Sequence, residues 1–101
     1  MLATLLCPQV LWAEAFTGGT LLTWSESDQR GYISAQLVMA STIASRNKPE
    51  MVDCIAETFF DGSGMSDEKF AEIVQTIGEY QSYHPSSVLV ILLENTCGAF
   101  G

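Results

Sequence analysis

The sequence predicts an all-α fold: one small single-domain bundle of about four to five helices, held by one disulfide. The length of 101 residues suits one domain, because compact domains usually need about 100 to 150 residues. Apolar residues also recur at helical spacing after typical helix-starting residues such as Ser66 and Pro85. The stretches between these segments are short, which favours antiparallel neighbouring helices around one core.

The composition limits what this domain can do. Apolar residues make up 48% of the chain, and 12 acidic residues against 4 basic ones leave a net charge of −8. This combination is typical of an acidic folded domain, since disordered chains pair high charge with low hydrophobicity. Nucleic-acid binding is disfavoured, because phosphate contacts need clustered Lys and Arg. We find no metal-ligand or cofactor motif, and we expect neither a metal, nor a cofactor, nor enzymatic activity.

Residues 1–15 are predicted to form a secretory signal peptide that is truncated at its start. Residues 1–13 carry no charge, and the Ala-Glu-Ala run ending at Ala15 has the small-x-small pattern that signal peptidase cuts. The alternative, a buried N-terminal helix, would be interrupted by Pro8. The segment is too short to span a bilayer, which takes ~20 apolar residues, so no stable membrane insertion is expected. Residues 16–101 would then form the helical domain.

The first part of this domain predicts two helices. Gly19 or Thr20 can cap a short apolar helix. A polar run at residues 25–29 then breaks the pattern. Within residues 30–44, apolar side chains fall almost all the way round the helical wheel, which is typical of the central helix of a small bundle. Pro49 forbids continuation of this helix.

The remaining residues predict three more helices. Residues 50–60 fit a short helix about as well as an irregular buried segment, and we favour the helix. The Asp61–Gly64 run is a loop by composition. Ser66 caps an amphipathic helix, and Pro85 opens a final apolar helix that Gly98 can stop. The apolar stripe of the amphipathic helix is Phe70, Ile73, Val74, Ile77 and Tyr80.

Cys54 and Cys97 are the cysteines that remain after removal of residues 1–15. An even pair in an exported protein predicts one disulfide, which would stabilise the fold by about 4 kcal/mol. The alternative is two free thiols, one of them reactive beside the sole histidine, His84. No flanking catalytic signature supports such a pair. We therefore expect His84 to have a structural or helix-capping role.

The negative charge is concentrated in the C-terminal half. From Glu50 onward the chain has nine acidic residues against one basic residue, Lys69. Such a field can steer a basic partner toward this half. The alternative is that the acids keep a hydrophobic small protein soluble.

Several short motifs follow one another along residues 16–101. They comprise Phe16, Gly18, Leu21 and Leu22, then Gly31, Tyr32 and Ile33, then Cys54, Pro85 and Cys97. In order and spacing they resemble the Rap/Tai family of bacterial immunity proteins. Three positions depart from the family: Gly19 stands where Asn is usual, Ser25 stands near a common early cysteine, and Ala56 replaces a proline. The missing early cysteine is consistent with loss of one disulfide as a pair.

The resemblance implies a small, helical, periplasmic protein that is often a homodimer. Such proteins neutralise a cognate protein toxin, commonly a peptidoglycan amidase delivered by a type VI secretion system, by plugging its catalytic cleft. The candidate plug is the loop at residues 59–65, which looks like an insertion; the alternative is a turn anchored in the core. Its partner-binding residues are expected to be Phe59, Phe60, Asp61, Ser63 and Met65.

A second function remains open from the sequence. A periplasmic helical chaperone or envelope stress protein would also combine small size, one disulfide and a high apolar content. The two functions differ in their clients, because a chaperone suppresses aggregation of unrelated proteins and an immunity protein binds one toxin.

Overall fold

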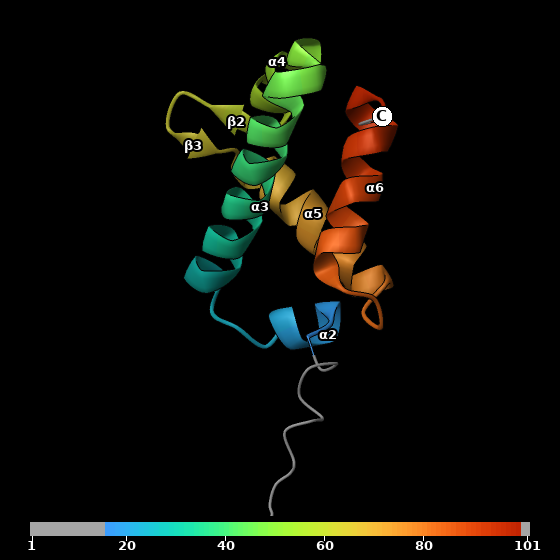
Figure 1. The fold of residues 1–101 in the computed structure, drawn as a ribbon. Helices are drawn as coiled ribbons and strands as arrows, with labels where there is room; N and C mark the ends of the chain where they lie inside the picture. The colour runs from blue at the N-terminus through green and yellow to red at the C-terminus, as the bar shows by residue number, and fades with distance from the viewer. Residues whose placement is uncertain (1–15, 100–101) are drawn as a thin grey trace, which may run out of the picture.

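A computed structural model describes residues 16–99, and the predicted signal segment therefore lies outside the described residues. Within this range the chain forms five helices and one small antiparallel hairpin (Figure 1). The all-α prediction is confirmed, with the hairpin as an addition. The elements are α2 (Gly18–Leu21), α3 (Glu26–Asn47), α4 (Pro49–Phe59), β2 (Phe60–Asp61), β3 (Gly64–Met65), α5 (Asp67–Glu79) and α6 (Pro85–Cys97).

Helix α3 begins earlier than predicted. The Ser25 side chain accepts a hydrogen bond from the backbone N–H of Asp28 at 3.1 Å, which caps the helix. Glu26 and Asp28 then lie in the first turn, where the positive end of the helix dipole favours acids. The expectation that residues 25–29 break the helical pattern was wrong, because this polar run is the start of the helix.

Helix α3 is also not the central helix of the bundle. Three of its residues are buried, yet Val38, Met39 and Ile43 are 56%, 58% and 54% exposed. Its apolar residues therefore divide between the core and an open face. Figure 1 shows α3 and α6 as separate columns, with α5 behind them.

The core is built from all five helices of the described range. In α4 the buried residues recur every fourth position, at Met51, Ile55 and Phe59, which confirms a helix there. The stripe of α5 is confirmed for its first members, but Tyr80 follows the helix and is 51% exposed. The buried apolar residues are Leu21, Ile33, Leu37, Ala44, Met51, Ile55, Phe59, Phe70, Ile73, Ile77, Val88, Leu89 and Leu93.

The short helix α2 closes one end of the bundle (Figure 1). Its side-chain cap is Thr17, and not Gly19 or Thr20 as predicted. The backbone N–H of Gly18 donates to the carbonyl of Tyr83 at 2.8 Å, and that of Gly19 donates to the carbonyl of Gln81 at 3.0 Å. These bonds hold α2 against the turn that joins α5 to α6.

Gly18 is expected to tolerate no larger side chain. A Cβ atom at this position would lie 2.8 Å from Cγ2 of Ile77 and 3.2 Å from its carbonyl oxygen. Gly18→Ala should therefore push α2 away from α5 and lower the free energy of unfolding by about 1–3 kcal/mol in urea titrations. The control is Gly31→Ala in α3, where a Cβ meets nothing within 4 Å and should stabilise the helix by about 0.5–1 kcal/mol. Equal effects of the two substitutions would contradict this packing.

Candidate functional site

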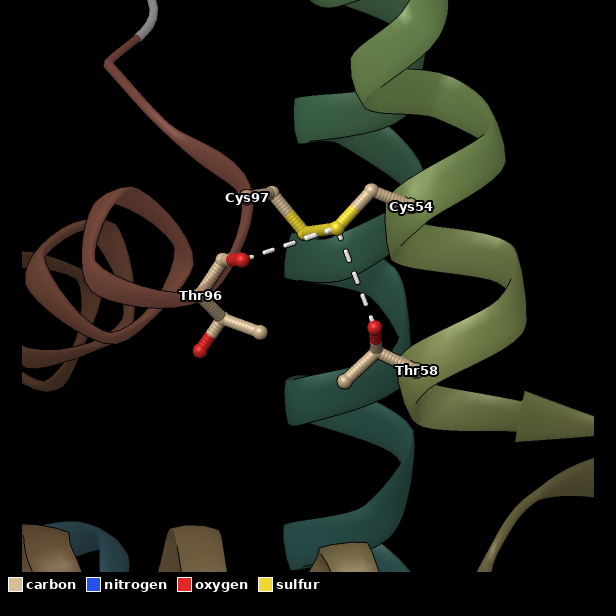
Figure 2. Close-up of a disulfide and its surroundings, with 4 residues drawn as sticks. All are labelled: Cys54, Thr58, Thr96 and Cys97. Carbon is tan, nitrogen blue, oxygen red and sulfur yellow. Dashed lines mark hydrogen bonds between the residues drawn. A yellow bond between two sulfur atoms is a disulfide. The ribbon is translucent and has the colours of Figure 1, made fainter.

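The predicted disulfide between Cys54 and Cys97 is present and ties α4 to the end of α6 (Figure 2). The Thr58 hydroxyl lies 3.8 Å from Sγ of Cys54 and can donate to it, because a bonded sulfur carries no proton. Near the same end of α6, Nζ of Lys48 donates to the carbonyl of Ala99 at 2.9 Å. Two tethers thus hold the C-terminal end of α6 against the start and middle of α4.

His84 caps a helix, as expected. Its Nδ1 accepts a hydrogen bond from the backbone N–H of Ser86 at 3.1 Å, at the start of α6. The imidazole also meets the Phe16 ring edge-on, with 5.3 Å between ring centroids. Because Cys54 and Cys97 are bonded to each other, neither of them is a thiol that His84 could activate.

Residues 16–99 contain no group of three His, Cys, Asp or Glu side chains placed to hold a metal ion. In the same range no helix is both long enough and apolar enough to cross a membrane.

The candidate plug at residues 59–65 is a tight hairpin and not an irregular loop. Phe60 pairs with Met65 and Asp61 with Gly64. Gly64 has φ of +123°, a conformation that side chains rarely adopt, so glycine suits this position. At the tip, the backbone N–H and the hydroxyl of Ser63 both donate to Oδ1 of Asp61 at 2.8 Å.

These two bonds lower the pKa of Asp61 below its ordinary value of 3.8, first through the backbone N–H of Ser63 and then through its hydroxyl. The carboxylate is therefore ionised at neutral pH. Because the folded pKa is lowered, the turn is stabilised above the ordinary pKa, and this contribution is lost as the pH falls through the lowered value.

The structure divides the five predicted partner-binding residues into three groups by burial. Phe59 is 5% exposed and belongs to the core. Phe60 and Met65 are partly buried and pack against that core. Asp61 and Ser63 are exposed at the tip. The segment is thus anchored in the core at its base and presents a polar, acidic turn to solvent.

Arg30 fixes the base of the hairpin, a role that sequence reasoning missed. Its Nη1 donates to the carbonyl of Met65 at 3.3 Å, and its Nη2 pairs with the carboxylate of Asp67. The guanidinium lies over the Phe70 ring, 4.4 Å from the centroid, in a cation–π contact. One side chain of α3 therefore joins the second strand of the hairpin to the start of α5.

A second surface feature is an open groove between α3 and α6, here called the α3–α6 groove. It measures about 240 Å³ and has no charged residue in its lining. At one end, Ser86 Oγ donates to Oε1 of Gln36 at 2.9 Å. Because this bond uses the one hydroxyl proton of Ser86, the Tyr32 hydroxyl is the donor in its bond with Ser86 at 2.7 Å. The groove is lined by Gln36, Met39, Ala40, Ile43, Ser86, Leu89, Val90 and Leu93.

Both helices present the same spacing to this groove. The α3 residues stand at positions 36, 39, 40 and 43, and the α6 residues at 86, 89, 90 and 93. Such a pattern is typical of helices that pack against further helices. Met39, Ile43 and Val90 are 58%, 54% and 42% exposed, so this apolar face is open within the described residues.

These features define a class of protein: a small disulfide-bonded helical bundle with one short hairpin that carries Asp61, and an open apolar face. Comparison of the chain with protein-family models, with curated proteins and with solved structures gave no match.

Proposed function

We propose that this protein is a periplasmic immunity protein that binds and neutralises a toxin delivered by type VI secretion, with a peptidoglycan amidase as the proposed class of toxin. The proposal starts from the ordered motifs between Phe16 and Cys97. The structural observation that supports it most is the hairpin, which projects from the side of the bundle away from α6 (Figure 1).

The hairpin has the properties that a cleft-blocking segment needs. A narrow turn can enter a cleft, and a turn that is rigid before binding loses little conformational entropy on binding. Here Asp61 and Ser63 fix the tip, while Arg30 and the buried Phe59 fix the base. The ionised Asp61 would face basic or hydrogen-bond-donating groups of the toxin.

The disulfide supports the proposed location. Disulfides persist in oxidising compartments such as the periplasm and are rare in the cytosol. The bond between Cys54 and Cys97 therefore agrees with an exported protein. The uncharged run at residues 1–13 and the Ala-Glu-Ala pattern that follows it support export in the same way.

The proposed homodimer would use the α3–α6 groove. Its lining is uncharged, so two acidic copies can meet there without placing like charges in the groove. Met39, Ile43 and Val90 line the groove and are 58%, 54% and 42% exposed, so they are open to contact with a second copy. The same face can then pair with its own copy around a two-fold axis.

We expect Asp61→Ala to weaken toxin binding at least tenfold, because it removes the carboxylate and both bonds that fix the turn. The measurement is calorimetric titration of the full chain with the toxin encoded beside it, together with a killing assay. Glu57→Ala is the matched control, since Glu57 is also an exposed acid and lies on α4, outside the hairpin.

The two readouts separate the possible failures. If the wild-type chain neither binds the neighbouring toxin nor protects against killing, the proposed function is wrong. If it protects, but Asp61→Ala and Glu57→Ala bind equally well, the hairpin is not the segment that enters the cleft.

The open α3–α6 groove favours one alternative, a periplasmic chaperone or envelope stress protein. Exposed apolar surface of this kind can hold unfolded clients. A chaperone would suppress the aggregation of several unrelated proteins at equimolar amounts, which an immunity protein should not do.

A further inference from the structure

A second groove runs between α5 and α6, here called the α5–α6 groove. Its volume is about 470 Å³, larger than that of the α3–α6 groove. None of the residues in its lining belongs to the hairpin, and in Figure 1 the hairpin projects from the opposite side to α6. It is lined by Thr76, Glu79, Tyr80, Tyr83, Ser87, Val88, Ile91, Leu92 and Asn95.

The groove combines an apolar floor with two aromatic rings at one end. Val88 is 7% exposed and Leu92 is partly buried, whereas Ile91 on the same helix is 59% exposed. Tyr80 and Tyr83 have ring centroids 6.2 Å apart, tilted by 55°. Both tyrosine residues are more than half exposed, so a ligand can reach them.

The charge around this groove is negative. Glu79 is its charged lining residue, and no Lys or Arg belongs to the lining. Lys69 is the one base on α5 and α6, and it pairs with Glu72 at 3.3 Å. A cation that enters the groove would therefore meet a carboxylate and two aromatic faces without an opposing base.

We propose that the α5–α6 groove binds a basic and apolar segment of a partner protein. An Arg or Lys of that segment lies against the rings of Tyr80 and Tyr83 beside the carboxylate of Glu79, and a neighbouring apolar side chain covers Val88 and Leu92. Cations stack on aromatic faces, and guanidinium groups do so most readily. Charge complementarity then sets the orientation of the segment in the groove.

A second copy of this chain fits the groove less well than a basic partner. Two copies would each bring a net charge of −8. Three of the four bases in the described range already have partners: Arg30 pairs with Asp67, Lys69 pairs with Glu72, and Lys48 donates to the carbonyl of Ala99. The α5–α6 groove shares no lining residue with the hairpin, so its binding can be tested without the toxin.

The test is an NMR titration of the ¹⁵N-labelled full chain with three twelve-residue peptides. One alternates Leu and Arg, one alternates Leu and Glu, and one alternates Ser and Arg. We expect the Leu/Arg peptide to shift the amide signals of residues 76–83 and 87–95 in a saturable way and to bind most tightly. Tyr83→Leu, which keeps apolar area but removes the ring, should weaken this binding roughly two- to fivefold, and so should Glu79→Gln.

Two matched variants show whether a loss of binding comes from the groove itself or from a general effect of substitution on the fold. Tyr83→Phe retains the ring and should bind as the wild type does, and Glu57→Gln on α4 removes an exposed acid elsewhere without effect. Equal binding of the Ser/Arg peptide would reduce the interaction to unspecific charge attraction and overturn the proposal. Equal binding of the Leu/Glu peptide, shifts confined to the α3–α6 groove, or no shifts at all would overturn it as well.

Discussion

Replacing both Cys54 and Cys97 with alanine is expected to lower the free energy of unfolding by about 4 kcal/mol. The bond closes a loop with a sequence separation of 43 residues, and the chain-entropy model assigns about this value to a loop of that length. The loop runs from α4 through the hairpin and α5 to the end of α6. Without the bond, the unfolded chain regains the freedom of all these elements.

Urea unfolding under non-reducing conditions measures this effect. Reduced wild-type protein should unfold at the same urea concentration as the double variant. Oxidised wild-type protein in the same urea series is the control, because it keeps the bond between Cys54 and Cys97. A loss below about 1 kcal/mol in the double variant would show that helix packing alone holds α6.

The size of this effect bears on where the protein can work. Domains of this kind are typically stable by about 5 to 15 kcal/mol, so a loss of about 4 kcal/mol removes a large share. The fold would then be weak in a reducing compartment. The stability of the fold therefore depends on an oxidising compartment such as the proposed periplasmic location.

Local signals in the sequence were sufficient to predict most of the helices. Ser66 and Pro85 mark helix starts in the structure, and Gly98 follows the last helix. In contrast, periodicity does not show which apolar face will be covered, so α3 was predicted to be central although Val38, Met39 and Ile43 are exposed. The hairpin was missed because two-residue strands carry no periodic pattern.

The surfaces proposed for binding were less predictable than the helices. Arg30 reaches Met65 across 35 positions of sequence, and nothing local indicates such a contact. The two grooves exist only because α6 lies beside both α3 and α5. Conversely, the motif residues Gly18, Leu21 and Ile33 are buried, so they build the fold and do not mark a contact surface.

Phe59→Ala is expected to lower the free energy of unfolding by about 3 kcal/mol or more, the usual cost of truncating a buried phenylalanine. Phe59 is 5% exposed as the last residue of α4, and its carbonyl accepts a hydrogen bond from the backbone N–H of Ser66 at 3.0 Å, which closes the hairpin. The next residue, Phe60, is only partly buried, so Phe60→Ala should cost clearly less.

This pair of variants decides whether Phe59 contacts the partner or anchors the hairpin. Thermal unfolding gives the stability of each variant, and binding to the toxin is then measured at a temperature where both remain folded. If Phe59 is an anchor, its loss destabilises the bundle, and binding weakens only as far as the hairpin loosens. Phe60→Ala should instead reduce binding with little loss of stability. A stable Phe59→Ala protein that no longer binds would place this ring in the contact surface and contradict its position in the core.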